Sequence, residues 1–205
     1  MTNDSKKHPE TPSKAQGGIF SIQRETQRQF VHILLGIFLI ILLFFLGKNK
    51  MLYFLSGTLF FGFLLINLVV RGYKVPIASW FVETFERKDA PLPGYGSAWY
   101  VVGLLLSCIL ITDINFLAAT IVILAFGDAA STIFGRKGTH FLPYNSKKTF
   151  EGSSALFLFS LIGYLFIGWK IFPLALAAAV VESLPIKIDD NLTIPLACVI
   201  VFHII

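Results

Sequence analysis

The sequence predicts an all-α, polytopic membrane protein built as a single helical bundle. Hydrophobic residues make up 55% of its 205 residues, and the mean hydropathy is +0.73. Apolar segments of roughly membrane-spanning length recur along the chain, with polar stretches between them. Because a soluble domain of this size does not need so much apolar surface, we expect a multi-pass integral membrane protein.

Seven apolar segments are predicted to cross the membrane as helices, because each approaches the length that a bilayer requires. Polar breaks separate them, such as Gly47-Lys48-Asn49-Lys50 after the first segment and Asp113 after the third. The seventh segment is short. In chain order, the segments are Val31–Leu46, Met51–Val70, Ala98–Thr112, Ile114–Phe134, Ser153–Gly168, Ile171–Leu184 and Ile194–Ile205.

The polar stretches also have predicted structures. Arg71–Ser97 contains prolines and is predicted to hold a short interfacial helix, Ile77–Phe85. Gly135–Gly152 and Pro185–Thr193 are predicted to be loops. Residues 1–18 are rich in Lys, Pro, Ser and Thr and lack the apolar core of a signal peptide, so we expect a disordered tail there. We expect residues 19–205 to form one transmembrane domain.

The distribution of charge predicts the topology. With these spans, 14 of the 17 Lys and Arg residues lie on the same side as the N-terminus, and Lys48, Lys50 and Lys170 lie on the other. Since cytoplasmic loops are enriched in positive charge, we expect a cytoplasmic N-terminus. Eleven of the 12 acidic residues lie on that side too, although acids contribute little to topology. We therefore expect the cytoplasmic face to carry a functional site.

Several other functional classes are not indicated. The pI near 9.3 does not predict a nucleic-acid-binding protein, because the basic residues are scattered between apolar segments. Cys108 and Cys198 lie within apolar segments, without metal-ligand spacing, and are interpreted as small apolar side chains. The sequence contains neither a P-loop motif nor the protein-kinase signature set.

Asp128 ends a long apolar run and is the first candidate site residue. An acid at membrane depth is costly and usually functional, so we interpret Asp128 as a metal ligand, a phosphate-site residue or a catalytic carboxylate. An interfacial ion pair with Arg136 or Lys137 is the structural alternative.

The loop that follows is basic and rich in glycine. Arg136, Lys147 and Lys148, with Gly135 and Gly152, are the residue types that surround a polyphosphate. A solvated cytoplasmic loop that obeys the positive-inside rule is the alternative. Glu151 lies three residues after Lys148, so the two share a face if a helix begins there. It is a second candidate for the carboxylate that activates a hydroxyl.

A third group of polar residues follows the sixth segment. Glu182 stands within an apolar run, and Asp189, Asp190 and Asn191 come shortly after it. Three carboxylates and an amide within ten residues could bind Mg²⁺ through oxygen. An N-cap for the seventh helix would account for part of this group, but not for both aspartates and Glu182.

The segment before the first predicted span carries a polar face. Glu25, Arg28 and His32 have the spacing i, i+3 and i+7, so they lie on one side of a helix. Glu25 and Arg28 could pair, and Arg28 is a further candidate for phosphate binding. His32 could act as a base, or it could be a packed histidine.

These motifs together resemble the CTP-dependent lipid kinases, a family that includes dolichol, phytol and diacylglycerol kinases. The resemblance runs from about Arg24 to the C-terminus. The blocks that carry it are Glu25-x-x-Arg28-x-x-x-His32-x-x-x-Gly36; Glu86-Arg87-Lys88 with Gly94 and Tyr100; Gly127-Asp128-Ala129-Ala130 with Gly135-Arg136; Lys148-Thr149-Phe150-Glu151-Gly152-Ser153; Glu182-Ser-Leu-Pro185; and Asp189-Asp190-Asn191-Leu-x-x-Pro195.

The resemblance implies a kinase that moves the γ-phosphoryl group of CTP, with Mg²⁺, to the hydroxyl of a membrane lipid alcohol. The phosphatidate cytidylyltransferases are distantly similar, but this chain lacks their Pro-Gly-His-Gly-Gly and Asp-Arg-x-Asp signatures. A cytidylyltransferase is therefore the second hypothesis. A small ion-coupled transporter is the third, although the acids lie at the helix ends and no internal repeat is visible. The lipid, the choice between CTP and ATP, and the oligomeric state stay open.

The residue patterns and the family resemblance together predict a role for each candidate residue. Catalysis is assigned to Asp128, Lys148, Glu151 and His32. Nucleotide and phosphate binding is assigned to Arg28, Gly135, Arg136, Lys147, Lys148 and Gly152. Metal binding is assigned to Asp128, Glu182, Asp189, Asp190 and Asn191.

Overall fold

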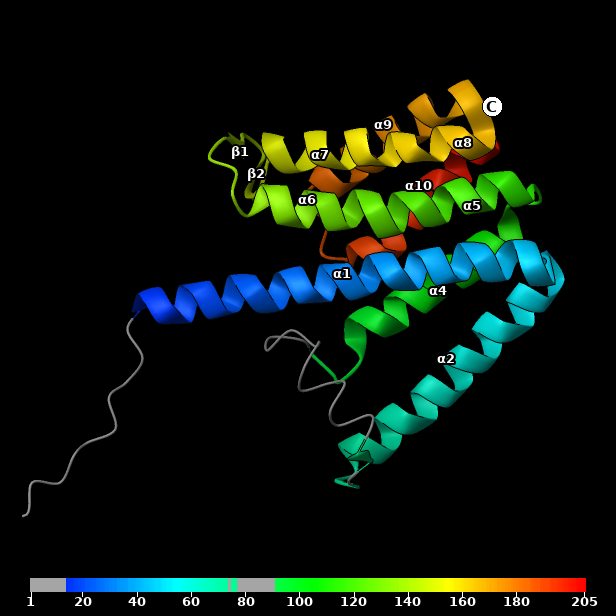
Figure 1. Ribbon diagram of the computed structural model, residues 1–205, viewed down its shortest axis with the longest axis horizontal. Coiled ribbons are helices and arrows are strands. Elements are labelled where there is room, and N and C mark those ends of the chain that lie inside the picture. Colours follow the sequence, from blue (N-terminus) through cyan, green and yellow to red (C-terminus); the bar gives the residue numbers. More distant parts are fainter. Residues whose placement is uncertain (1–13, 74, 77–90) are drawn as a thin grey trace, which may run out of the picture.

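The computed structural model describes residues 14–73, 75–76 and 91–205, and it consists of packed helices with one small β-hairpin (Figure 1). The main helices are α1 (Lys14–Leu46), α2 (Lys48–Val70), α4 (Tyr95–Leu110), α5 (Ile114–Val122), α6 (Asp128–Gly135), α7 (Phe150–Ser160), α9 (Ile171–Ser183) and α10 (Asp190–Phe202). Short elements complete the chain: a π-helix (Ile123–Gly127), strands β1 (Phe141–Leu142) and β2 (Asn145–Thr149), the 3₁₀ turns Leu161–Gly163 and Gly168–Lys170, and α8 (Tyr164–Ile167).

Side-chain caps explain where three of the helices begin. Asp113 accepts hydrogen bonds from the backbone N–H groups of Asn115 and Phe116 at the start of α5. Thr149 accepts one from Gly152 at the start of α7, and Asp189 accepts one from Asn191 at the start of α10. Such caps satisfy backbone donors that a helix leaves unpaired.

The continuous helix Ile114–Gly135, which comprises α5, the π-helix and α6, forms the centre of the bundle. Its most apolar window is 78% buried, against 6% for that of α2. Helices α1, α7 and α10 pack against it and α9 packs on α7 and α10, and fully buried side chains such as Leu43, Leu124, Leu156 and Leu174 fill the core. This core holds the residues of the central helix in fixed positions.

The outer surface of α1 and α2 is strongly apolar. Phe45, Phe60, Phe61 and Phe63 are all more than 60% exposed. Phenylalanine side chains that face outward from long apolar helices are compatible with contact to lipid rather than water.

Among the described residues, four helical stretches are long and apolar enough to cross a membrane: Glu25–Leu46, Lys48–Val70, Ile114–Gly135 and Phe150–Ser183. The last is interrupted at Gly168, where φ is +56°, and α9 packs back against α7. Tyr95–Leu110 and Asp190–Phe202 are apolar but shorter. Each of the seven predicted segments contains a helix, but the count of seven spans and the cytoplasmic N-terminus stay predictions.

Three local features differ from the sequence-based expectation. Helix α1 begins at Lys14, so the last five residues of the expected tail are helical. The predicted loop Gly135–Gly152 contains the antiparallel hairpin β1–β2, so the protein is not purely α-helical. The fourth predicted span contains a π-helical turn. The predicted interfacial helix Ile77–Phe85 and the block Glu86-Arg87-Lys88 lie outside the described residues.

Candidate active site

Lys148 is the central cation of the candidate site. Its Nζ donates to Glu182 Oε1 at 2.5 Å and to Asp190 Oδ2 at 2.8 Å. The lysine comes from β2, and the two acids come from the end of α9 and the first turn of α10. Burial alone would lower the pKa of Lys148, but the charges of Asp190 and Glu182 outweigh it and raise this pKa. The lysine is therefore held charged and in one place.

Glu182 is the most buried of these groups, with 2% of its surface exposed. Besides Lys148, its carboxylate lies within hydrogen-bonding distance of Ser131 Oγ at 3.2 Å and Ser153 Oγ at 3.3 Å. Both of its oxygens are thus engaged by the protein. The structure gives Glu182 the role of orienting Lys148, and the metal-binding role expected from the sequence stays untested.

The β-hairpin positions Lys148 against these acids. Asn145 Nδ2 donates to the backbone carbonyl of Ser183 at 2.9 Å, and the hydroxyls of Tyr144 and Ser183 lie 2.9 Å apart. These contacts attach the turn between β1 and β2 to the end of α9. Because Glu182 precedes Ser183, the same attachment fixes Lys148 relative to its partner.

Two arginines are held by one buried acid. Glu25 Oε2 accepts a hydrogen bond from Arg136 at 2.9 Å, and Glu25 Oε1 accepts from Arg28 and from Gln29. Glu25 is 8% exposed, whereas the side chain of Arg136 is 45% exposed. The ion pairs join α1 to the end of α6, and this end of α6 lies beside the hairpin that carries Lys148 (Figure 1).

The π-helical turn shapes the surroundings of Asp128. It ends directly before Asp128, whose backbone N–H reaches back five residues to the carbonyl of Ile123. The carbonyl of Leu124 lies 3.1 Å from His32 Nε2, which is also 3.9 Å from Asp128 Oδ2. Since a carbonyl can only accept, Nε2 carries a hydrogen, and a neutral His32 keeps Nδ1 as its acceptor. Turns of this kind often occur at functional sites.

Tyr100 of α4 completes this side of the site. Its ring makes an edge contact with His32, with centroids 4.6 Å apart. Among the described residues, three buried side-chain oxygens have no hydrogen-bond partner: the hydroxyls of Tyr100 and Thr193, and Asn191 Oδ1. A buried polar atom without a partner is costly, so these atoms are candidates for contact with a ligand. The sequence analysis gave Tyr100 no role, because one hydroxyl in an apolar segment is a weak signal.

Glu151, Gly135 and Gly152 make structural contacts within the protein. Glu151 accepts hydrogen bonds from the backbone N–H groups of Thr139 and His140 and pairs with the His140 ring at 2.7 Å. It therefore anchors the loop before β1. A Cβ on Gly152 would lie 3.0 Å from Gly135 Cα, so both glycines permit close packing of α6 on α7. Their predicted roles in catalysis and phosphate binding are not tested by these contacts.

The predicted metal ligands are not gathered into one preformed cluster. The described part of the chain contains no group of three or more His, Cys, Asp or Glu residues able to hold a metal ion. Asp189 caps α10, and Asn191 Nδ2 donates to the Gly96 carbonyl at 3.3 Å. The available oxygens nevertheless fit Mg²⁺, which is usually bound by one or two carboxylates together with substrate phosphates. Asp128, Asp190 and the buried Asn191 Oδ1 have oxygens of this type, and their role as metal ligands stays a prediction.

The structure thus brings most of the predicted residues to one end of the bundle. Lys148 contacts both Glu182 and Asp190, and Ser131 connects this group to Asp128, because its Oγ lies 3.2 Å from Glu182 Oε1 and 3.0 Å from the backbone carbonyl of Asp128. The side chain of Lys147 is exposed beside them. The supporting hydroxyls of Ser131 and Ser153 were not assigned as site residues from the sequence, because a serine in an apolar helix usually bonds its own backbone.

Known proteins resemble this chain over most of its length. It is 35% identical over 175 residues to an uncharacterized protein of Methanocaldococcus jannaschii, covering 84% of this chain and 89% of that protein. It is 29% identical over 208 residues to phytol kinase 1, chloroplastic, of Arabidopsis thaliana, covering 89% and 67% of the two chains. Farnesol kinase, chloroplastic, of the same plant is 29% identical over 202 residues, with 87% and 64% covered.

The chain belongs to the lipid kinase family of the phytol and farnesol kinases. It spans about two thirds of the length of these plant kinases. No model of a known protein family matches it, and no solved structure matches it.

Proposed function

We propose that this chain is a membrane lipid-alcohol kinase that transfers the γ-phosphoryl group of CTP to the hydroxyl of an isoprenoid alcohol. One observation carries the proposal: Lys148 is held between Glu182 and Asp190, at the same end of an apolar bundle as Asp128 and two arginines. The relatives named for phytol and farnesol, two isoprenoid alcohols, support the class of acceptor.

Cations at this end would bind the triphosphate. Phosphoryl transfer depends on positioning and charge neutralisation more than on covalent chemistry by the protein. Lys148 and Arg136 are fixed by acids on neighbouring helices, so each would meet a phosphate oxygen without first being ordered. Arg28 and the exposed Lys147 add charge at the same end. This prearrangement supports their assignment as phosphate ligands.

Asp128, Asp190 and Asn191 would hold Mg²⁺ together with the phosphates. The ion, when bound, would neutralise charge on the β- and γ-phosphate oxygens. Asp190 is shared with Lys148, so its carboxylate lies where a cation and a phosphate would both be close. The engaged Asp189 and Glu182 would act as supports for this set.

The acceptor hydroxyl would lie between Asp128, His32 and Tyr100. Its oxygen forms the new bond to the γ-phosphorus, the bond from that phosphorus to the β-phosphate oxygen breaks, and CDP leaves. The hydroxyl proton passes to the Asp128 carboxylate or to His32 Nδ1. The buried Tyr100 hydroxyl would donate a hydrogen bond to the acceptor oxygen and so fix its direction of attack.

The test is a transfer assay with purified full-length protein in detergent. CTP or ATP labelled at the γ-phosphate, Mg²⁺ and a panel of lipid alcohols are incubated, and the lipid is extracted. Label in the lipid that depends on CTP and on an isoprenoid alcohol is the expected result. Label from ATP alone would overturn the choice of CTP. Release of pyrophosphate from CTP with phosphatidate, and no labelled lipid, would instead identify a cytidylyltransferase.

A further inference from the structure

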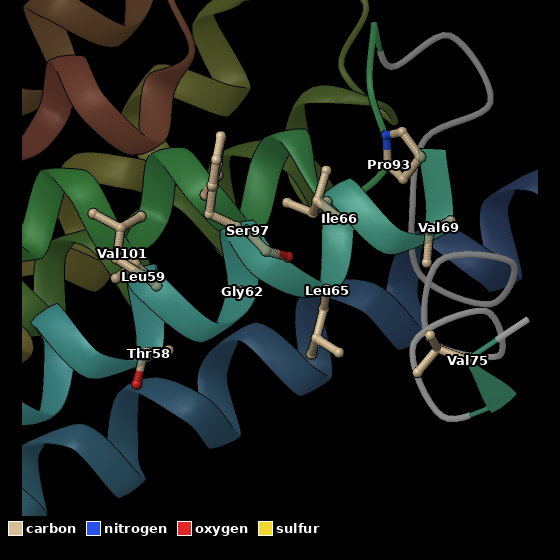
Figure 2. A pocket seen from close by; sticks show the side chains of 13 residues that line it. Thr58, Leu59, Gly62, Leu65, Ile66, Val69, Val75, Pro93, Ser97 and Val101 are labelled. Carbon is tan, nitrogen blue, oxygen red and sulfur yellow. The ribbon is translucent and has the colours of Figure 1, made fainter. Parts of the chain in front are cut away.

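An apolar groove with a volume of about 460 Å³ lies between α2 and α4. Figure 2 shows that its walls come from these two helices: Leu59, Gly62 and Ile66 of α2 lie beside Ser97 and Val101 of α4. Apart from the hydroxyls of Thr58 and Ser97, the side chains that line it are apolar, and the Thr58 hydroxyl is already bonded to the Phe54 carbonyl. The groove offers a ligand contact with hydrocarbon and almost no polar recognition.

Helix α4 lies between the groove and the candidate active site. Ser97, Ala98 and Val101 form one face of α4 and line the groove. An adjoining face of α4 carries Gly96 and Tyr100, which contact Asn191 and His32. Asn191 follows Asp190, the partner of Lys148. A ligand in the groove is therefore separated from the catalytic end by the width of α4, close to the end of the helix.

This arrangement fits an amphiphile with one small polar end. A ligand site of this volume is typical for a small organic molecule, and an apolar lining selects a chain rather than a headgroup. A lipid alcohol could pass its hydroxyl around the start of α4 toward Tyr100 while its chain stays in the groove. A phospholipid would need room and polar partners for its headgroup, and among the described lining residues two hydroxyls are the sole polar side chains.

We propose that the groove between α2 and α4 binds the hydrocarbon tail of the acceptor alcohol and sets the chain length that the enzyme prefers. This inference rests on the proposed function. It assigns to α2 and α4 the recognition of the tail, and leaves recognition of the hydroxyl to the residues around Asp128.

Two glycines of α2 provide a matched test. A Cβ on Gly62 or on Gly57 would meet no atom within 4 Å, so a side chain can leave the backbone at either position without a clash at its Cβ. Gly62 lines the groove, whereas Gly57 does not. We expect Gly62→Phe to lower kcat/KM for a C20 isoprenoid alcohol by about tenfold or more, because the ring occupies space that the tail needs. Gly57→Phe should leave it unchanged.

A short acceptor separates tail binding from catalysis. A C5 prenyl alcohol has too little chain to depend on the groove, so Gly62→Phe should phosphorylate it as well as the wild type does. Equal loss with both alcohols would mean that the substitution disturbs the catalytic end, and would overturn the inference. Loss in Gly57→Phe as large as in Gly62→Phe would overturn it as well.

Direct labelling gives a readout that does not require turnover. A photoreactive C20 isoprenoid alcohol should crosslink to residues of α2 and α4 such as Leu65 and Val101, mapped by mass spectrometry, and excess unlabelled alcohol should compete. Competition by phospholipid at the same concentration would identify a general lipid site and overturn the inference, as would labelling elsewhere. Labelling of the groove in a protein that transfers no phosphoryl group in any assay would support tail binding in the groove and contradict the proposed kinase activity instead.

Discussion

Lys148 and Glu182 form an ion pair whose two members have different surroundings. The lysine side chain is 27% exposed, whereas that of the glutamate is 3% exposed. A buried carboxylate is tolerated when cations and hydrogen-bond donors surround it, here Lys148 with the hydroxyls of Ser131 and Ser153. Glu182 therefore depends on Lys148 for the stability of the fold as well as for any role in the reaction.

Removing the lysine alone should destabilise the protein. We expect Lys148→Met to lower the free energy of unfolding by about 3 kcal/mol, the order found when one partner of a buried pair is lost. Lys148→Met combined with Glu182→Gln should recover most of that stability, since no uncompensated charge remains. Thermal unfolding in detergent measures both. The double variant should stay inactive, and recovery of lipid phosphorylation in it would exclude a catalytic Lys148.

The raised pKa of Lys148 predicts a loss of stability in alkali. Burial opposes the charge, but Asp190 and Glu182 raise the pKa above the usual value of 10.5. A group whose pKa is raised by folding stabilises the protein fully below its unfolded-state pKa, and this contribution disappears as the pH rises through the folded-state pKa. The wild type should therefore lose thermal stability above about pH 10.5. The Lys148→Met/Glu182→Gln variant should show a smaller loss, and an equal loss would argue against the pair as its cause.

Asp128 is expected to act in the reaction rather than in the fold. Asp128→Asn keeps the shape of the side chain and removes its charge, so we expect kcat for lipid phosphorylation to fall about 10²- to 10⁴-fold, the range for a lost general base. Asp113→Asn is the matched control. It caps the start of α5 at the far end of the same continuous helix, and asparagine caps equally well. Similar activity in both variants would remove Asp128 from the mechanism.

The sequence located these residues because charge in an apolar run is costly and therefore conspicuous. Asp128 and Glu182 were found in this way, whereas Lys148 was found because it lies in a basic loop rich in glycine. It could not show that Glu182 would face Lys148, since 34 residues separate them and the contact depends on how α9 packs on α7. Tyr100 and Ser153 stand in the blocks that carry the resemblance but received no role from the sequence, because hydroxyls are common in apolar helices.

At the scale of elements, the π-helical turn Ile123–Gly127 and helix α1 together position the His32 ring. Gly36 of α1 packs on this turn so closely that a Cβ at Gly36 would lie 2.2 Å from Ala125 Cβ. The same two elements hold His32 against the Leu124 carbonyl, one turn earlier along α1. The distance between α1 and the π-turn therefore controls where the His32 ring stands relative to Asp128.

Exchanging one methyl group between these elements tests that dependence. Gly36→Ala should push α1 away from the π-turn, lower thermal stability and reduce kcat, because His32 moves with α1. Adding Ala125→Gly removes the opposing Cβ, so the double variant should regain activity. Its free energy of unfolding should stay lower by about 1 kcal/mol, the cost of glycine in a helix. Thermal unfolding and the transfer assay check both variants. Failure of Ala125→Gly to rescue activity would show that the close approach does not position the site.

Long apolar helices were predictable, whereas the elements that depend on tertiary contacts were not. Val31–Leu46 and Met51–Val70 were found by composition, and both lie within helices that end at the predicted residues, Leu46 and Val70. The hairpin β1–β2 has little strand propensity of its own and is held by Asn145 and its contact with α9. The π-turn carries no sequence signature, since it differs from an α-helix by one residue of register.

At the scale of the whole molecule, the site residues share one end of the bundle. Lys148 belongs to the hairpin and Arg136 directly follows α6, which ends beside the hairpin, whereas the turn between α1 and α2 lies at the other end of the bundle (Figure 1). A kinase that draws its donor from the cytoplasm and its acceptor from the membrane needs the first end to face the cytoplasm. The excess of Lys and Arg on that side predicts the same orientation independently of the reaction.

Cysteine labelling in intact cells measures this orientation. Lys137 and Asn49 are exposed at opposite ends, while the native Cys108 and Cys198 are buried and should give little background. A maleimide that cannot cross membranes should label Asn49→Cys in intact cells and Lys137→Cys only after permeabilisation. Labelling of Lys137→Cys in intact cells would place the cations away from the nucleotide pool. It would then contradict both the predicted topology and a kinase that uses cytoplasmic CTP, because the two depend on the same end of the molecule facing inward.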